Sequence, residues 1–539
     1  MKILFHTVLD SEEFRNGSMA GEFLRRGHEV VVITHSRLHE MVLKKCSFLQ
    51  GRVENIQPRV LQIVDKISSG QALDILEELL PGFDIPNAME DDILFSDLDS
   101  RLAARHAAAL ASVMSEILKS PLVPFDMLYS ETGYLYRHIG SMCAQAAGVV
   151  FLPIESSRVN GRFVLLESGQ GNWLGLPQAW KGVQSNEIVN PFKSTEALID
   201  PAELEIETER YLSDFHEAGM PKGTDVMLGR PVFRTRALTT AANYLFRDFL
   251  VERGAFPYCW WFPITRRAVI RRLRCLVCSF MGNDVYWKNF DLCHETFVFY
   301  PMPVPWETTV RHRAPKFADN LSVIRGMAAN LPDGIRLYVK EHPINLGGTP
   351  LAELKAMAEL PNVRLLPPET DSRLLISRAF RTITLNGTAG LETILMGRRP
   401  ITLANCFYDI FGFCDRAESF SHLGDILSRE SMGPFPGKDD VAKIVKAMII
   451  ASWKGEMDYS APSKYPLFGN HKNLAVLADV YEYVMKYFDE RPTEGQLEAQ
   501  TEGQLEAQNE KLTEKPEFYR VASYNLKQTK QFDDSRRVK

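Results

Sequence analysis

Residues 336–413 carry the clearest structural signal in the chain. They begin RLYVKEHPINLGGTP at 336–350 and end NVRLLPPETDSRLLISRAFRTITLNGTAGLETILMGRRPITLANCFYDIFGF at 362–413. The apolar run 337–339 predicts a short strand. This strand should end near His342, because Pro343 disfavours helix at the preceding residue and has no amide hydrogen to give a sheet. Lys340 and His342 are therefore expected at the carboxyl end of a strand.

A second strand in this stretch ends at a turn suited to an anion. Residues 382–385 form a β-rich run, which breaks at residues 386–388 and restarts as a helical pattern at 389–396. A strand, a glycine turn and a helix start leave free backbone N–H groups at the positive end of the helix dipole. Two such strand ends in one parallel sheet, one with a cation and an imidazole, predict a pocket for a nucleotide monophosphate or diphosphate.

Length and composition limit the classes of protein to be considered. At 539 residues the chain is expected to form two or three domains. The formal net charge is −6, whereas a nucleic-acid-binding protein would carry a basic balance, so no nucleic-acid partner is expected. Eight cysteines in a chain of this length do not make a disulfide framework.

Neither a metal nor a cofactor nor a membrane span is expected. Cys275 and Cys278 form a lone C-x-x-C pair with no second pair nearby to complete a zinc site. Asp97 and Asp99 form a D-x-D motif, which binds metal in some enzymes, but the surrounding sequence is helical and solvated. The amino-terminal run MKILFHTV is too short for a signal peptide, and no run of about 18 apolar residues occurs. We expect a cytoplasmic protein.

The order of predicted elements indicates an α/β protein with two Rossmann-like domains. A strand at 2–7, a helix ending at Gly27 and a strand at 29–34 make one βαβ unit, without the G-x-G-x-x-G pattern of NAD-binding proteins. Strand patterns restart at 296–300. The predicted division is a first Rossmann-like domain at 1–180, a helical or irregular connecting segment at 181–290, a second Rossmann-like domain at 291–490 and a polar tail at 491–539.

Two segments lie outside the α/β pattern. The connecting segment contains FPYCWWFP at 256–263, followed by five arginines up to Arg274. This composition is typical either of a peripheral anchor on an anionic membrane or of buried aromatic packing with an exposed basic face. The octapeptide TEGQLEAQ occurs at 493–500 and again at 501–508 without a sustained apolar stripe, which predicts a disordered or loosely helical tail.

Carboxylates also follow strands in the first half of the chain. A strand predicted at 125–130 ends at Glu131, and a strand predicted at 149–154 ends at Glu155. Ligands of doubly wound sheets bind at such strand ends. Carboxylates in these positions also cap the helices that follow, so a structural role stands beside the functional one for both residues.

Together, these motifs resemble the capsule polysaccharide biosynthesis family, which includes bacterial Kdo transferases that build capsule linkers. The residues that carry the resemblance are KEHP at 340–343, NGTAGLE at 386–392 with Gly397 and Pro400, and Tyr408-Asp409 with Gly412. PWETT at 305–309 resembles the Pro-Glu-x-(Ser/Thr)-Thr loop of the family, with Trp306 interrupting the match. The resemblance covers residues 290–415 well and 125–175 weakly.

The resemblance implies a GT-B fold, a nucleotide-activated sugar donor, often CMP-Kdo, and a saccharide or glycolipid acceptor of the bacterial surface. Polysaccharide-assembly proteins are further expected partners, and the segment at 256–274 would provide a peripheral contact with the inner membrane. In the family, the His-Pro motif and the Gly-Thr turn hold the donor phosphate. A glutamine is common before that turn, whereas Asn386 here has a reach shorter by one methylene, which leaves the donor open.

The expected chemistry centres on a departing phosphate. His342 and the amides of Gly387 and Thr388 would hold it, because donors fixed where charge develops stabilise the transition state more than the ground state. Glu392 would accept from a ribose hydroxyl or serve only as a carboxylate near a helix start. The residues expected in donor binding are Lys340, His342, Pro343, Asn386, Gly387, Thr388, Ala389, Glu392, Tyr408 and Glu307.

A general base for the acceptor hydroxyl is expected from the amino-terminal half. Glu155 is the first candidate, Glu131 the second and Asp10 the third. His342 completes the expected catalytic set. Side chains and the helix end would neutralise the leaving group, so no metal is expected in the reaction.

Three alternatives remain at this stage. A polyol-phosphate polymerase that uses CDP-glycerol shares a GT-B fold and a His-Pro motif, but its usual Asp-Tyr-Ser-Ser motif is absent here. A sugar-nucleotide epimerase is a second alternative. A non-catalytic scaffold in envelope polysaccharide assembly, held by residues 256–274 and the tail, is the third.

Overall fold

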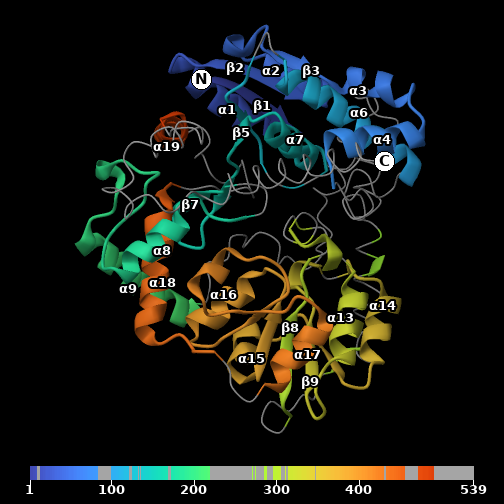
Figure 1. Cartoon of the computed structure of the whole chain (residues 1–539), viewed down its shortest axis with the longest axis vertical. Helices are drawn as coiled ribbons and strands as arrows, with labels where there is room; N and C mark the ends of the chain where they lie inside the picture. Colours follow the sequence, from blue (N-terminus) through green and yellow to red (C-terminus); the bar gives the residue numbers. More distant parts are fainter. Residues whose placement is uncertain are drawn as a thin grey trace, which may run out of the picture.

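Figure 1 shows the computed structural model of the chain. The structure describes residues 1–8, 12–82, 99–120, 124–131, 133, 135–167, 171–218, 270, 273–274, 285–287, 295–304, 307, 310, 313–317, 319–345, 347–429, 433–455 and 471–490. The predicted tail at 491–539 and Asp97 of the D-x-D motif lie outside these residues.

The first half forms a five-stranded parallel sheet in the order β3-β2-β1-β4-β5. Its strands are β1 (Lys2–Thr7), β2 (Glu29–Thr34), β3 (Val53–Asn55), β4 (Met127–Tyr129) and β5 (Val150–Phe151). Its helices are α1 (Glu12–Arg25), α2 (Arg37–Lys44), α3 (Gln57–Val64), α4 (Ser69–Leu79), α6 (Ser100–Leu118) and α7 (Leu135–Ala146). Leu4 and Leu128 pack among α3, α4, α6 and α7, whereas Ile3 and Phe5 pack on the opposite face with α1. The sheet is therefore doubly wound.

The second half forms a six-stranded parallel sheet in the order β10-β9-β8-β11-β12-β13, at the bottom of Figure 1. Its strands are β8 (Phe297–Pro301), β9 (Arg336–Lys340), β10 (Val363–Leu366), β11 (Arg381–Thr384), β12 (Ile401–Thr402) and β13 (Asp415–Arg416). Helices α13 (Asn320–Ala329), α14 (Leu351–Ala358) and α17 (Phe420–Ser428) contribute to the core on one face, and α15 (Ser372–Arg378) and α16 (Thr388–Leu395) lie on the other. The strand order reverses between β8 and β11, which is where ligands of such sheets bind.

The predicted class, α/β with two Rossmann-like domains, is confirmed by these two strand orders. The expected strand end before Pro343 is also confirmed, since β9 stops at Lys340. The helix predicted after the glycine turn begins at Thr388. Pro343 instead opens the short 3-10 turn η5 (Pro343–Asn345), which redirects the chain away from the sheet.

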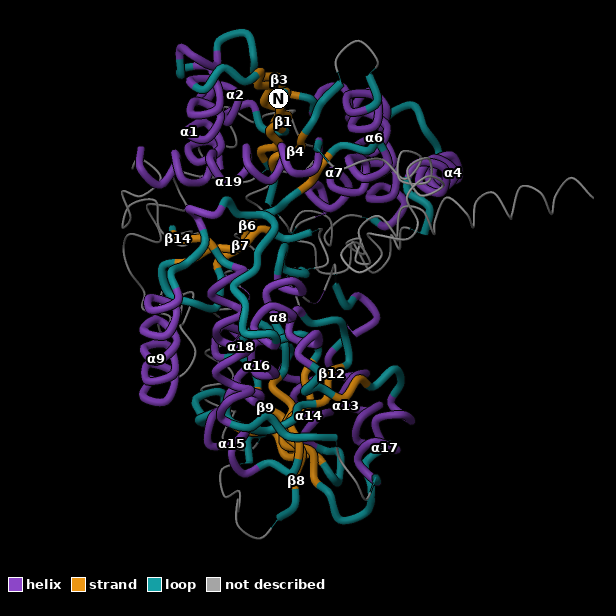
Figure 2. The backbone as a smooth tube through the Cα atoms, turned by 60° about the vertical axis from the view of Figure 1, so that its left-hand side comes forward, coloured by secondary structure: helices purple, strands orange, loops and turns teal. Residues whose placement is uncertain are grey.

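A small antiparallel sheet lies between the two halves, as Figure 2 shows. It joins β6 (Ile154–Ser156) and β7 (Arg162–Leu165) to β14 (Trp453–Lys454), which comes from the other end of the chain. Phe163 and Leu165 belong to a core with Phe5 of the first sheet, whereas Val164 belongs to a core with Leu391 of α16. Alternate residues of β7 thus bind the two halves together.

The helices beside this small sheet pack on the second half. They are α8 (Leu176–Gln184), α9 (Pro201–Ala218) and α18 (Lys438–Ala451). Trp173 stacks on Phe407 with ring centroids 4.3 Å apart, and Trp180 lies edge-on to Phe411 at 5.0 Å. These aromatic contacts therefore connect the segment around α8 to residues 407–411 of the carboxyl-terminal half.

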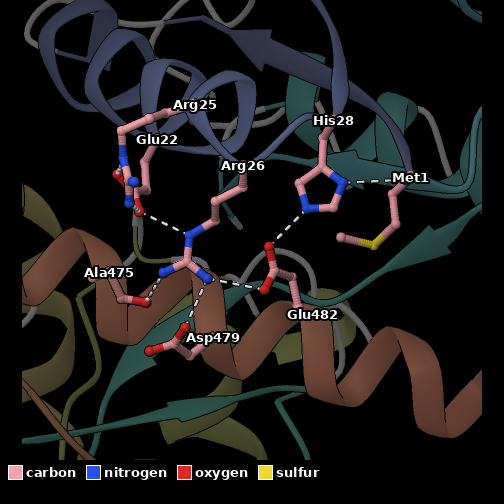
Figure 3. A network of polar contacts seen from close by, with 8 residues as sticks. All are labelled: Met1, Glu22, Arg25, Arg26, His28, Ala475, Asp479 and Glu482. Atoms are coloured by element: carbon pink, nitrogen blue, oxygen red, sulfur yellow. Dashed lines mark hydrogen bonds and ion pairs between the residues drawn. The ribbon is translucent and has the colours of Figure 1, made fainter.

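The last described helix, α19 (His471–Asp489), returns to the first half and lies along α1 (Figure 3). Arg26 connects them: its guanidinium donates to Asp479 at 2.7 Å and to Glu482 at 2.9 Å. On α1 the same guanidinium donates to the buried Glu22 at 2.8 Å. The last described helix therefore contributes to the amino-terminal unit.

Candidate active site

Lys340 ends β9 on the face of the sheet that carries α15 and α16. The side chain is only 8% exposed, and Nζ donates to the Ser372 hydroxyl at 2.8 Å, at the start of α15. Burial lowers the pKa of Lys340, and the negative charges of Glu392, Asp371 and Glu369 oppose this shift. The ammonium is thus held in place beneath the strand end rather than extended into solvent.

His342 lies two residues beyond and is exposed. Its carbonyl accepts from the Asn345 amide at 2.8 Å, which closes the η5 turn. Partial desolvation by the surrounding protein, and then the nearby Lys340 charge, lower the pKa of His342. The imidazole is therefore neutral at physiological pH and can donate a hydrogen bond from one ring nitrogen.

The turn after β11 leaves the start of α16 without a side-chain cap. Gly387 is the N-cap residue, with φ −77° and ψ 165°, and as a glycine it supplies no side-chain cap to the first turn. Its own amide donates to the Thr384 hydroxyl at 3.2 Å. The N–H groups of the first turn, from Thr388 and Ala389, are the donors that an anion would use.

Tyr408 supports this turn from inside the protein. The side chain is fully buried, and its hydroxyl donates to the Gly387 carbonyl at 2.8 Å. Gly390 is required beside it, because a methyl group at that position would overlap the Tyr408 hydroxyl. Tyr408, expected among the donor-binding residues, therefore fixes the backbone that would bind the donor and does not itself face solvent.

Charge interactions connect the two strand ends. Strands β9 and β11 flank β8, so their carboxyl ends lie two strand spacings apart, about 10 Å. Lys340 interacts electrostatically both with His342, just after its own strand, and with Glu392 on α16. The described structure thus places His342 and the start of α16 at one edge of one sheet, with the charge of Lys340 acting on both His342 and Glu392.

Glu392 lies one turn into α16 among cations. Burial raises its pKa to about 7, and the positive charges of Arg373, Lys340 and Arg158 oppose the shift. Arg158 comes from the β6–β7 hairpin and Arg373 from α15. The site therefore contains a carboxyl group that gains or loses its proton near neutral pH.

The other expected donor-side residues lie in the turns around this edge. Asn386 precedes the uncapped turn and is half-buried, as is Pro343 at the start of η5. The carbonyl of Ala389 accepts from the Thr393 hydroxyl at 2.6 Å. Glu307 lies in a turn in which its amide donates to the Val304 carbonyl at 3.0 Å.

The two described base candidates each take part in an ion pair. Glu155 pairs with Arg313 at 2.7 Å, which ties the β6–β7 hairpin to the segment before α13. Glu131 pairs with Arg137 of α7 at 3.3 Å, and both side chains are largely buried. Asp10 lies outside the described residues. Which carboxylate acts as a base stays a prediction.

Several residues of this edge were not found from the sequence. They are Ser372, Arg373 and Arg313. Ser372 had a local signal, because Asp371 caps the helix that it begins. The two arginines come from different segments, so nothing near them in the sequence marks them as neighbours of Glu392 or Glu155.

Among the described residues, no group of three or more His, Cys, Asp or Glu side chains is arranged to hold a metal ion. The described part of the chain also contains no helix that is both long enough and apolar enough to cross a bilayer. Of the predicted anchor at 256–274, only residues 270, 273 and 274 are described, and Arg274 donates to the Gly348 carbonyl at 3.1 Å.

Residues 292–423, which contain this edge, match the family described as "Capsule polysaccharide biosynthesis protein". The match is confined to this segment, which is about a quarter of the chain. The resemblance expected from KEHP and NGTAGLE is therefore confirmed. A curated relative, Protein FixF of Sinorhizobium fredii, is 27% identical over 135 residues, which is 24% of this chain and 32% of the relative. The match thus spans about a third of the length of that relative.

Two solved structures match the chain at low sequence identity and low TM-score. A beta Kdo 2,4 transferase structure of KpsC from Thermosulfurimonas dismutans is 13% identical and covers 60% of this chain and 79% of its own, with a TM-score of 0.32. A Methanocaldococcus jannaschii UDP-GlcNAc 2-epimerase in complex with UDP-GlcNAc and UDP is 11% identical, covers 83% and 99%, and has a TM-score of 0.25. Both superpositions are loose, and the fold assignment stands on the strand orders given above.

Proposed function

We propose that the chain is a glycosyltransferase of capsule polysaccharide biosynthesis, which transfers a sugar from a nucleotide-activated donor. The observation that carries the proposal is the uncapped start of α16, at the same sheet edge as Lys340 and His342. An uncapped helix start binds anions through its N–H groups and its dipole. The match of residues 292–423 to a capsule family supports a sugar nucleotide over other phosphates.

In the proposed reaction, negative charge builds on the donor phosphate as the glycosidic bond breaks. The neutral His342 imidazole and the α16 amides donate to this group, and the Lys340 ammonium adds a fixed positive charge. Because these donors are held before the reaction starts, they stabilise the developing charge without reorganisation. We therefore propose a transfer that does not depend on a metal ion.

The acceptor, in this proposal, is a saccharide or glycolipid of the bacterial surface. A carboxylate from the amino-terminal half removes its proton. Glu155 and Glu131 remain the candidates, and their ion pairs with Arg313 and Arg137 keep each carboxylate near a fixed position. Action on the cytoplasmic face of the membrane, with polysaccharide-assembly proteins as partners, is part of the same proposal.

A thermal-shift screen of the full chain tests donor binding. CMP, CDP, UDP and GDP compounds are added separately, and a ligand at 100 times its dissociation constant should stabilise the protein by about 2.7 kcal/mol. We expect the compounds of one nucleotide base to raise the unfolding midpoint. The same compounds should raise the midpoint of His342→Ala by less. If none of the four shifts the unfolding midpoint, the non-catalytic scaffold becomes the better interpretation.

Two incubations then separate the enzyme classes. Turnover of CDP-glycerol into polymer would identify a polyol-phosphate transferase, and conversion of a sugar nucleotide without any acceptor would identify an epimerase. Either product would contradict the proposal. Incorporation of sugar only when a saccharide acceptor is present would support it.

A further inference from the structure

Glu341, between Lys340 and His342, is almost completely buried, whereas His342 beside it is exposed. Its side chain is 1% exposed. It accepts hydrogen bonds from the Thr349 hydroxyl at 2.6 Å and from the Asn345 side-chain amide at 3.2 Å, both on one oxygen. The Tyr286 hydroxyl lies 3.3 Å from the other oxygen. A buried carboxylate is costly unless it is hydrogen-bonded, and here three side chains surround it.

The loop after β9 is wound around this carboxylate. Asn345 donates from its backbone amide to the His342 carbonyl at 2.8 Å, and from its side chain to Glu341. The Gly348 amide then donates to the Asn345 carbonyl at 2.6 Å. A methyl group at Gly348 would overlap the Asn345 side chain, so the loop closes tightly at this point. The backbone at His342 is therefore set by residues that converge on Glu341.

Tyr286 fastens the same carboxylate to the sheet. Its neighbour Trp287 donates from the backbone to the Leu365 carbonyl of β10 at 2.7 Å. The Trp287 ring also lies against the Arg364 guanidinium, 4.3 Å from the ring centroid. Glu341 thus joins the His342 loop to a segment that is bound to a neighbouring strand, and the loop does not depend on its own contacts alone.

We propose that Glu341 is a positioning residue, which holds the His342 imidazole where it can donate to the donor phosphate. The inference rests on the proposed function for its effect on turnover, and on the contacts above for its effect on His342. Glu341 faces away from the side of the sheet that carries Lys340 and Ser372, so it acts through the loop and does not touch the donor. Small displacements of a positioned donor reduce rates strongly.

Two substitutions separate the hydrogen bonds of Glu341 from its charge. Glu341→Gln keeps the oxygen that Thr349 and Asn345 use, and its amide can donate to the Tyr286 hydroxyl. Glu341→Leu removes both acceptor oxygens and leaves a side chain of similar volume. We expect Glu341→Gln to retain kcat/KM within about threefold and Glu341→Leu to lower it at least tenfold. Tyr286→Phe, which removes one peripheral donor, should fall between them.

Both substitutions are also made in a His342→Ala background. If Glu341 acts through the imidazole, Glu341→Leu should change the remaining rate less than about twofold there, because the group that it positions is already absent. An equal loss in both backgrounds would overturn the inference, as would a loss in Glu341→Gln as large as that in Glu341→Leu. A Glu341→Leu protein with full activity would also overturn it.

The NMR signal of His342 tests the inference without an activity measurement. In protein labelled at histidine ring carbons, the His342 signal is identified as the one that is lost in His342→Ala. We expect it to shift or broaden in Glu341→Leu and to stay in place in Glu341→Gln. An unchanged resonance in Glu341→Leu overturns the inference. If the resonance responds while the wild-type protein binds no nucleotide, the proposed function fails and the positioning role stands.

Discussion

The carboxyl edges of the two sheets have the same topology but different chemistry. On the first sheet, His6 and His35 are fully buried and hydrogen-bond each other at 2.8 Å, with Gln57 on the far side of His35 at 3.2 Å. On the second sheet, His342 is exposed and lies at the same edge as the uncapped α16. A Rossmann-like strand order creates an edge in both cases, but the described histidines of the first edge are buried, whereas His342 of the second is exposed.

The electrostatics of the two histidine sites follow from this difference. Burial, and then the charges of His35 and Arg137, lower the pKa of His6 well below its usual value, and burial lowers that of His35 to about 3. Both rings are neutral and occupied with each other. The two histidines of the first sheet are therefore engaged in internal contacts with each other and with Gln57, whereas the imidazole of His342 on the second sheet lies at the surface.

The largest effect that would test this contrast is expected from His342→Ala. Loss of a donor at the departing phosphate should reduce transfer by at least 100-fold, on the order of 2.7 kcal/mol of transition-state stabilisation. The unfolding midpoint should not change. His422→Ala, at a half-buried histidine of α17 in the same half of the molecule, serves as the matched control and should retain activity. A folded His342→Ala protein with near-normal activity contradicts the site.

The reverse pattern is expected from His6→Ala on the first sheet. Truncation leaves a cavity and removes the 2.8 Å partner of His35, so the free energy of unfolding should fall by about 2–3 kcal/mol. For a unit of about 150–250 residues, this corresponds to an unfolding midpoint about 4–12 °C lower, measured by calorimetry. Nucleotide affinity at temperatures where the protein remains folded should be unchanged. A loss of nucleotide affinity without a loss of stability would mean that the first edge is also a ligand site.

A smaller effect is expected from Gly390→Ala. The added methyl group overlaps the Tyr408 hydroxyl, which must move and release the Gly387 carbonyl. We expect the dissociation constant of the donor to rise about tenfold, which is about 1.4 kcal/mol. Gly326→Ala, at a helical glycine packed against the Phe420 ring, provides a control for crowding in the same half and should leave nucleotide affinity unchanged. Isothermal titration gives both constants.

The smallest effect is expected from the protonation of Glu392. Its pKa of about 7 means that the carboxyl group is mostly neutral at pH 6 and ionised at pH 8. The ionised form repels the donor phosphate, so affinity should fall as pH rises through 7, by about fivefold or on the order of 1 kcal/mol. Sugar nucleotides are suitable probes because their phosphodiester groups do not titrate in this range. This pH dependence of donor affinity should be absent in Glu392→Gln. If it persists in that variant, a different group is responsible for it.

Some features of the site were predictable because they depend on backbone preferences of a few adjacent residues. Pro343 ends β9 at Lys340, and Gly387 precedes the start of α16 at Thr388. Proline and glycine restrict or free the backbone wherever they stand, so their effects can be read without knowing the fold. The predicted boundaries at 180 and 290 had no comparable signal and stay predictions.

Other features depended on contacts between residues far apart in the chain. Glu155 was expected as a general base and is found paired with Arg313, and Tyr408 was expected among the donor-binding residues and lies beneath Gly387. A carboxylate or a tyrosine at a strand end has the same local sequence in either situation. Which partner it meets is decided by how the segments pack.

The sequence by itself determined where strands end, where the glycine turn before α16 lies and that two Rossmann-like units form. These follow from apolar periodicity, Pro343 and Gly387, which act within a few residues. Only the tertiary structure decided that β14 completes a sheet with β6 and β7, that Glu341 holds the His342 loop, and that Glu392 lies among three cations. The physical reason is that burial and charge pairing depend on neighbours brought together from separate segments, which no short stretch of sequence specifies.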